Sequence, residues 1–327
     1  MPTCLLTGAT GFLGAHVARS LLAHGWTVRA LARGGPERLK DLVSLGVVPV
    51  PGDLSARTDL AAAALNVDAV VHVAGITKAR TREDYREGNA RATALLVEAA
   101  RQSAPEALFL LVSSQAAAGP ARRGRPVTEE DSARPISWYG ESKREGEEAV
   151  KAGWRGPRVI VRPSIVFGPG DRGLFVLFQA ARRGWLPVPA GDSKVQLIRA
   201  ERAAEAIARA AARPDLSGRT GFLADPDPIA ISDLSRLIAR LPSRRPHLMP
   251  VPRVLIRAAG AAETLVETLT RRSRPFNADK AREILAGDWT CSGTAFARDL
   301  ALPGPPPLFE ELSATWDWYV RSGWLAL

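Results

Sequence analysis

The sequence predicts an α/β fold in which a doubly wound parallel sheet is followed by a smaller, mostly helical lobe. Short apolar runs of strand length alternate with amphipathic helical stretches as far as about residue 163. The first run, Thr3–Thr7, leads directly into glycines at positions 8, 11 and 14 and then into an apolar-periodic helix. Beyond about residue 171 helices predominate. We therefore expect one domain over residues 1–171 and a second lobe over residues 172–327, which returns one or two strands to the main sheet.

Composition limits the classes of protein to which the chain can belong. It has 327 residues, 46% of them hydrophobic, and a formal net charge of +10, so its length suits two units with a large core. Cys4 and Cys291 are too few and too far apart for a disulfide framework or a metal site, which favours a reduced, cytoplasmic protein without a metal. The basic groups at 122–125 and 271–274 are not interleaved with aromatic residues, so we expect no nucleic-acid partner. No apolar run reaches the length of a membrane span, and we expect neither a signal peptide nor a membrane partner.

The three glycines after the first strand each have a physical reason. Gly8 lets the chain turn sharply off the strand, Gly11 lets the backbone approach a pyrophosphate, and Gly14 lets the helix pack closely on the strand. The phosphates would lie at the positive N-terminal end of the helix. This arrangement predicts a dinucleotide site of the Rossmann type; the simpler alternative is a tight turn that binds nothing.

The end of the second strand indicates which dinucleotide is bound. Thr27–Ala32 is followed by Arg33, roughly where a Rossmann unit places the residue that contacts the adenosine ribose. An acidic residue there favours NAD, whereas a cation can pair with the 2′-phosphate of NADP. Arg38 and Lys40 lie within reach in the next turn. We therefore favour NADP(H) and keep NAD(H) as the alternative; Arg33 would otherwise be an ordinary exposed side chain.

Two further strands end in residues suited to a cofactor. Asp53 and Leu54 follow the third strand, where the carboxylate could accept a hydrogen bond from the adenine amine or, equally, cap a helix that begins two residues later. The fourth strand ends in the small residues Ala74 and Gly75, which leave room for a ligand. His72 lies inside this apolar run, so we expect it to be packed and not catalytic.

Polar residues at a strand end and on a helix form the candidate catalytic group. Ser113 and Ser114 lie at the carboxyl end of the fifth strand, where ligands bind in open parallel sheets. Tyr139 and Lys143 are four residues apart, so both side chains lie on one face of a helix that opens near residue 137.

These features together resemble the extended short-chain dehydrogenase/reductases, which include the NAD(P)-dependent epimerase/dehydratase family. The resemblance covers about the first 170 residues. It rests on the glycine loop, Ser114, Tyr139, Lys143, and the stretches Arg162-Pro163 and Gly168-Pro169-Gly170.

The resemblance implies roles for individual residues. Ser114 would hydrogen-bond the substrate oxygen, with Ser113 as the weaker candidate. Tyr139 would be the general acid/base, and cationic Lys143 would lower its pKa, ordinarily about 10, and bind the nicotinamide ribose. Asn89 resembles an asparagine that family members commonly carry. The residues implied to bind the cofactor are Gly8, Thr10, Gly11, Phe12, Leu13, Gly14, Arg33, Lys40, Asp53, Leu54, Ala74, Gly75, Tyr139, Lys143, Pro163, Ile165 and Val166.

Departures from the family pattern narrow the reaction. Sugar-nucleotide dehydratases carry Thr-Asp-Glu where this chain has Ser114-Gln115-Ala116, so the acids for an elimination are missing. Arg33 favours members similar to dihydroflavonol reductases and hydroxysteroid dehydrogenases. We predict an oxidoreductase that transfers hydride between NADP(H) and a secondary alcohol or ketone. The alternatives are a nucleotide-sugar epimerase with tightly bound NAD and a non-catalytic cofactor-binding sensor or assembly protein, although such proteins tend to lose the Ser, Tyr or Lys present here.

The second lobe and the long helices indicate partners in broad terms. Apolar helices in the lobe hint at a lipid-like, aromatic or polyketide-like small molecule more than at a sugar nucleotide. The helix over Val254–Leu269 is apolar along one stripe, which we expect to pack in the core or at an interface and not on a membrane. The resemblance implies a homodimer formed through the helices expected near 83–103 and 137–152.

Overall fold

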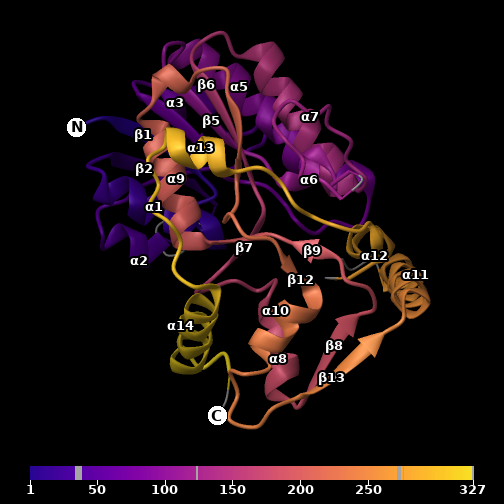
Figure 1. The fold of residues 1–327 in the computed structure, drawn as a ribbon. Coiled ribbons are helices and arrows are strands. Elements are labelled where there is room, and N and C mark those ends of the chain that lie inside the picture. Colours follow the sequence, from indigo (N-terminus) through magenta and orange to yellow (C-terminus); the bar gives the residue numbers. More distant parts are fainter. Residues whose placement is uncertain (34–38, 123, 271–273, 275, 326–327) are drawn as a thin grey trace.

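Seven strands form the central sheet of the molecule. The computed structural model describes residues 1–33, 39–122, 124–270, 274 and 276–325. The strands are β1 (Thr3–Thr7), β2 (Thr27–Ala32), β3 (Val48–Pro51), β4 (Ala69–His72), β5 (Leu108–Val112), β6 (Arg158–Pro163) and β11 (Thr220–Leu223). They pair in parallel in the order β11-β6-β5-β4-β1-β2-β3 (Figure 1). The order reverses between β1 and β4, so a crevice opens at the carboxyl ends of these strands.

Helices cover both faces of this sheet, which confirms the doubly wound α/β fold. Leu6 faces the core under one helix pair, while its neighbour Leu5 faces the opposite core, as the two-residue period of a strand requires. The first pair is α1 (Phe12–Ala23) and α9 (Ala200–Ala211), and the other face carries α3 (Leu60–Ala64), α5 (Ala92–Ser103) and α7 (Trp138–Gly153).

The second half of the chain contributes to the main sheet and also builds a lobe. β11 and α9 belong to the sheet and its cover, and in α13 (Thr294–Asp299) the Phe296 ring packs against Gly221 of β11. The lobe has its own core, which includes Phe178, Leu186 and Tyr319. Its helices are α8 (Phe175–Arg182), α10 (Ile231–Ile238), α11 (Arg253–Thr270), α12 (Ala278–Leu285) and α14 (Leu308–Arg321). Its strands are β7 (Ile165–Phe167), β8 (Trp185–Pro189), β9 (Lys194–Val195), β10 (Leu197–Arg199), β12 (Ile229–Ala230) and β13 (His247–Val251). The division of the chain at residue 171 stays a prediction.

The apolar stripe of helix α11 does not pack in the core, one of the two places expected for it, and packing at an interface stays a prediction. Only Ile256, Gly260 and Glu267 of this helix are buried. Gly260 lies against Ala281 of α12, and Glu267 accepts a hydrogen bond from Asn277, which caps α12. The apolar stripe itself is exposed. No helix in the described ranges has both the length and the apolar composition needed to cross a bilayer.

His72 ties β4 to its two neighbours inside the core, as expected for a packed histidine. Its Nδ1 lies 2.7 Å from the hydroxyl of Thr7 on β1, and its Nε2 lies 3.0 Å from the hydroxyl of Thr93 on α5. Burial, aided by the charge of Lys143, lowers the pKa of His72 to about 3. The folded protein therefore holds this imidazole neutral.

This neutral histidine predicts a loss of stability in acid. Between pH values of about 6.5 and 3 the unfolded chain binds a proton at His72 that the folded chain does not, so the free energy of unfolding falls by about 1.4 kcal/mol per pH unit as the pH drops. His72→Gln removes this contribution, and urea unfolding measured at several pH values should show a shallower decline. His247→Gln, on exposed β13, is the control. Equal slopes for His72→Gln and wild type would contradict the assignment.

Candidate active site

The glycine loop joins β1 to α1 beside the segment that follows β4. Gly8 has φ +80°, and a Cβ there would lie 2.6 Å from the backbone nitrogen of Ala74. A Cβ on Gly14 would collide with the carbonyl oxygen of Gly8. Gly11 is different, because its Cβ would meet only the Gly8 carbonyl oxygen, at 3.2 Å, among the described atoms. No side chain caps α1 at Gly11, so the loop offers free N–H groups at a helix N-terminus, which fits a pyrophosphate.

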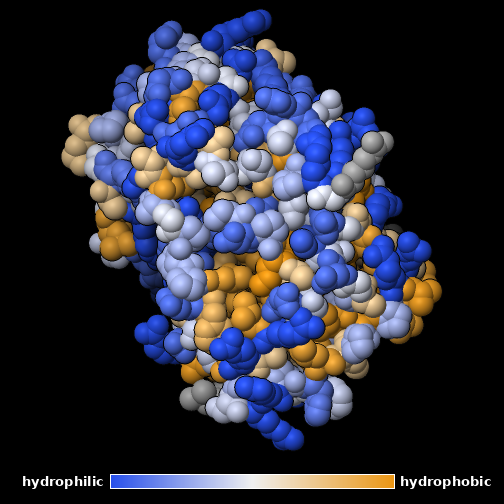
Figure 2. All heavy atoms as spheres, in the orientation of Figure 1, coloured by the Kyte–Doolittle hydropathy of each residue, from blue (hydrophilic) through white to orange (hydrophobic). Residues whose placement is uncertain are grey.

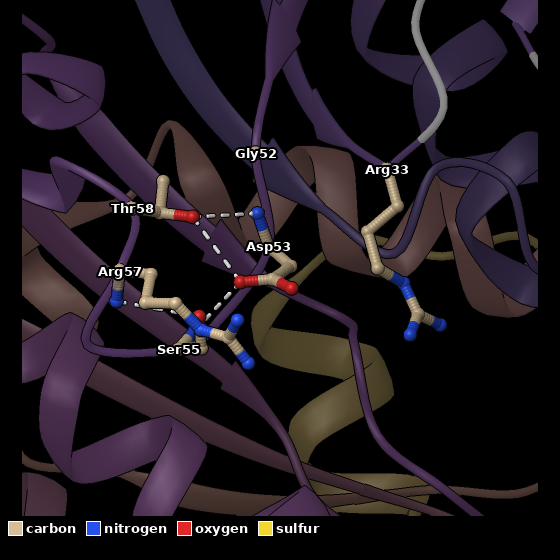
Figure 3. A pocket seen from close by; sticks show the side chains of 6 residues that line it. All are labelled: Arg33, Gly52, Asp53, Ser55, Arg57 and Thr58. Carbon is tan, nitrogen blue, oxygen red and sulfur yellow. Dashed lines mark hydrogen bonds between the residues drawn. The ribbon is translucent and has the colours of Figure 1, made fainter.

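Arg33 lies at a cavity of about 460 Å³ beyond the ends of β2 and β3. The cavity is lined by Arg33, Gly52, Asp53, Ser55, Arg57 and Thr58 (Figure 3). Arg33 and Arg57 flank Asp53 from opposite sides, and both are exposed. Lys40, which begins α2 (Lys40–Val43), does not line the cavity, and Arg38 lies outside the described residues. Arg57 is a second cation at this site that the sequence analysis did not find.

Asp53 closes a turn and does not cap a helix, so that part of the prediction is wrong. Its Oδ1 accepts hydrogen bonds from the backbone N–H of Ser55 and the hydroxyl of Thr58, each at 3.1 Å. The Ser55 side chain has the largest effect on the pKa of Asp53, and with the Thr58 hydroxyl, the Ser55 backbone N–H and the charge of Arg33 it holds that pKa below its usual value. The next helix, α3, begins only at Leu60 and is capped by Asp59. Contact of Asp53 with adenine stays a prediction.

Ser114, Tyr139 and Lys143 come together at the carboxyl end of β5. Ser114 caps α6 (Gln115–Ala118), where its Oγ accepts from the backbone N–H of Ala116 at 3.1 Å. Its side chain also lies close enough to Tyr139 to lower the pKa of the phenol. Lys143 is buried, and its Nζ donates to the carbonyl oxygen of Val112 at 2.7 Å. The same Nζ would lie 3.5 Å from a Cβ placed on Gly75. Tyrosine, serine and lysine thus border the crevice beside the small residues that follow β4.

Burial sets the protonation of the tyrosine and the lysine. It raises the pKa of Tyr139 to about 12, against the effect of the Ser114 hydrogen bond. Burial lowers the pKa of Lys143 to about 8, although the negative charge of Glu147 acts to raise it. The expected lowering of the Tyr139 pKa by Lys143 is therefore not found. Lys143 is turned toward Val112, and the influence that opposes burial comes from Ser114.

Asn89 fixes the loop after β4 to α7. The helix expected over 83–103 consists of α4 (Arg82–Tyr85), a π-helical turn η2 (Arg86–Arg91) and α5. Within η2, the Asn89 Oδ1 accepts from the N–H of Ile76 at 2.8 Å, and its Nδ2 donates to the Ile76 carbonyl at 3.0 Å and to the Ser142 hydroxyl at 2.9 Å. Asn89 thus binds both backbone polar groups of Ile76, and its place in a π-helical turn is typical of residues near functional sites.

Ser113 faces the core below the site. Its hydroxyl donates to Glu147 Oε1 at 2.6 Å, and this buried carboxylate also receives two hydrogen bonds from Arg162, at 2.8 and 2.6 Å. The carboxylate, the guanidinium and the hydroxyl satisfy one another, so Ser113 joins β5 to α7 and β6. Ser114 is the serine that faces the crevice.

The end of β6 borders the site with unpaired polar groups. Pro163 is buried, and Ile165 and Val166 follow it in β7. Between them, the buried Ser164 Oγ lacks a hydrogen-bond partner in the described chain, as does Nε2 of Gln115 next to Ser114. A buried polar group without a hydrogen-bond partner lowers the stability of the folded protein, unless a bound ligand supplies the missing partner. Both groups fit a polar ligand such as a nicotinamide and its substrate, and the sequence analysis had not assigned them.

The glycine loop at the start of α1 and the group of Ser114, Tyr139 and Lys143 thus lie at the carboxyl edge of one parallel sheet. The chain belongs to the NAD dependent epimerase/dehydratase family, whose model matches residues 4–221. It is accordingly an oxidoreductase of the extended short-chain type.

Two curated relatives are similar to the chain in sequence, and one solved structure is similar to it in fold. The ceramide reductase of Caulobacter vibrioides is 36% identical over 323 residues, which cover 98% of this chain and 95% of the relative. The 4-hydroxy-2-methyl-3-oxo-4-farnesyl-3,4-dihydroquinoline-1-oxide ketoreductase of Stigmatella aurantiaca is 28% identical, covering 83% of this chain and 81% of the relative. The structure of MoeE5 in complex with UDP-glucose and NAD superposes with a TM-score of 0.78 at 21% identity, over 98% of this chain and 99% of that one, and has the same fold.

The two neighbouring serines provide a matched pair of substitutions. Ser113→Ala and Ser114→Ala each remove one hydroxyl, and each should lower the free energy of unfolding by about 1 to 2 kcal/mol. Ser114→Ala should also lower kcat by about 10²-fold or more, because it removes the donor to the substrate oxygen. Ser113→Ala should keep turnover, because Arg162 still holds Glu147. Thermal unfolding and steady-state kinetics measure both effects, and an equal loss of turnover in the two variants would contradict the assignment.

Proposed function

We propose that the protein is an NADPH-dependent reductase that converts a ketone on an apolar small molecule to a secondary alcohol. The observation that carries this proposal is that Tyr139 lies close enough to Ser114 for the serine to lower the pKa of its phenol, with Lys143 buried one helical turn away. When bound, the reduced nicotinamide supplies the hydride. The residues of the chain must then orient the ketone and deliver one proton to its oxygen.

Ser114 and Tyr139 have different roles at the ketone oxygen: the serine donates a hydrogen bond, and the tyrosine donates the proton. Ser114 Oγ accepts from Ala116. Its own hydrogen, which acts on Tyr139 in the free protein, would turn to the substrate oxygen when the ketone binds. Negative charge grows on that oxygen as hydride arrives at carbon, and the Ser114 hydrogen bond stabilises it. Tyr139 then gives up its proton, so that C=O, hydride and proton become CH–OH.

Protonation of Tyr139 supports the direction of reduction. With a pKa of about 12, the phenol is protonated at neutral pH and can donate. Lys143, with a pKa of about 8, is mostly charged there. We assign it to the nicotinamide ribose, where its charge and its position beside Gly75 suit a ribose hydroxyl.

Two arginines support NADPH over NADH. Arg33 and Arg57 border the cavity at the ends of β2 and β3, where a Rossmann unit contacts the adenosine ribose. Guanidinium groups pair well with phosphate oxygens. The two together would bind the 2′-phosphate that distinguishes NADP(H).

Relatives and surface support an apolar substrate. The relatives reported above are named for ceramide and for a farnesylated quinoline. Hydrophobic side chains also gather over the lobe below the main domain (Figure 2). A cytoplasmic setting agrees with two free, buried cysteines. A homodimer through α5 and α7 remains part of the proposal, tested by sedimentation velocity.

Tyr139→Phe tests the proton donor. The variant keeps the ring but cannot donate, so reduction of long-chain methyl ketones should slow by about 10²- to 10⁴-fold while NADPH affinity is largely kept. Lys143→Ala should damage both turnover and NADPH affinity. Initial rates from NADPH absorbance and binding from NADPH fluorescence measure the two effects separately. If Tyr139→Phe keeps most of the activity, the proton is delivered by another group.

Arg33→Asp tests the choice of cofactor. The carboxylate repels a 2′-phosphate and can accept from ribose hydroxyls, so the ratio of NADPH to NADH affinity should fall by about tenfold or more. Arg57→Asp should act in the same direction. Arg19→Asp, an exposed position on α1 away from the cavity, makes the same change of charge and should leave the ratio unchanged. An unchanged ratio in both cavity variants would mean that these arginines are merely exposed.

A further inference from the structure

The outer face of α11 is apolar where a surface helix is normally polar. Val254, Leu255, Ala258, Ala262, Leu265 and Leu269, here called the α11 patch, fall within an arc of about 100° on the helix. No charged residue lies in that arc. Val254 is 67% exposed, Leu265 60% and Leu269 75%. The helix is therefore amphipathic in the reverse sense, with its apolar side turned to the exterior.

The acidic residues of α11 are turned inward. Glu263 pairs with Arg274. Glu267 is buried, and it accepts from the backbone N–H of Arg274 at 2.6 Å and from Asn277 Nδ2 at 3.3 Å. Both carboxylates are thus used to hold the loop between α11 and α12. The exposed side of the helix is left without negative charge.

The patch continues into the strands next to it and has a basic border. Only Pro252 separates α11 from β13, which pairs with β8. These strands expose Trp185, Leu248 and Met249, and Figure 2 shows hydrophobic side chains where Figure 1 has α11, β8 and β13. Exposed arginines border this surface; they are Arg244 and Arg245 before β13, and Arg253 and Arg257 on the flank of α11.

We propose that the α11 patch docks on the surface of a bilayer that contains anionic lipids. An amphipathic helix with an apolar face, basic flanks and a nearby tryptophan is the arrangement that lies in a membrane interface. The arginines complement lipid phosphates, and the chain as a whole carries a charge of +10. A second copy of the chain fits less well, because a twofold contact would bring the basic borders of both copies together. The proposal departs from the sequence-based expectation that the helix over Val254–Leu269 packs in the core or at an interface and not on a membrane, because the structure leaves its apolar side exposed.

Docking would bring the catalytic tyrosine near the bilayer. α12, which packs on α11, contacts the start of α7: Ser137 Oγ donates to Glu283 at 2.6 Å, and the N–H of Trp138 lies 3.1 Å from Asp279. Tyr139 is the next residue. Docking through the exposed side of α11 does not depend on which substrate the protein reduces.

Vesicle sedimentation tests the docking surface in the full-length protein without substrate. Wild type should pellet with vesicles made of equal parts phosphatidylcholine and phosphatidylglycerol, and bind more weakly to phosphatidylcholine alone. Leu265→Glu/Leu269→Glu should weaken binding to the mixed vesicles by roughly tenfold or more. Arg244→Glu/Arg245→Glu should weaken it by a similar factor and remove the preference for anionic lipid. Leu65→Glu, an exposed leucine at the end of α3, is the matched control and should bind like wild type.

Two outcomes would overturn the proposal. In the first, wild type stays in the supernatant with both vesicle types, or the leucine variant binds as wild type does. In the second, sedimentation velocity without lipid shows a wild-type dimer that Leu265→Glu/Leu269→Glu converts to monomer, which would make the patch a contact between copies. Circular dichroism and NADPH titration of each variant confirm folding, so a failure here stays distinct from a failure of the proposed reductase activity.

Discussion

The buried pair of Glu147 and Arg162 is the interaction on which the site depends. Their side chains are 0% and 5% exposed, so each charge needs the other, and removing one partner would leave an uncompensated charge in the core. The pair joins α7 to β6, and Ser113 adds β5. Lys143, one turn earlier on α7, reaches Val112 of β5. Tyr139 is therefore held at the carboxyl ends of two strands by contacts that lie one to two turns below it.

Most of the fold and much of the catalytic group could be predicted from the sequence, because short-range rules govern them. The strand before Gly8 and the helix that contains Gly14 follow from periodicity, and the structure shows that side chains larger than glycine would collide at both positions. The four-residue spacing of Tyr139 and Lys143 fixes a shared helix face. Ser114 follows from its place at a strand end. Each of these inferences uses residues within one or two elements.

The features that the sequence did not reveal depend on contacts between distant segments. Arg57 lines the same cavity as Arg33 because the segment after β3 lies beside the end of β2. The pKa of Tyr139 reflects burial by α7 and its neighbours, which spacing alone does not report. The apolar stripe of α11 was visible in the sequence, but which side of the helix faced the interior was not. That orientation follows from Gly260 against Ala281 and from the loop that Glu267 holds.

The most direct measurement is a fluorescence titration of the purified wild-type protein with NADPH and with NADH, after denaturing a sample to look for nucleotide carried through purification. The account predicts an empty site and clearly tighter binding of NADPH. NAD that remains bound through dialysis would contradict it in favour of an epimerase. Binding of neither nucleotide would contradict the assignment of the glycine loop itself.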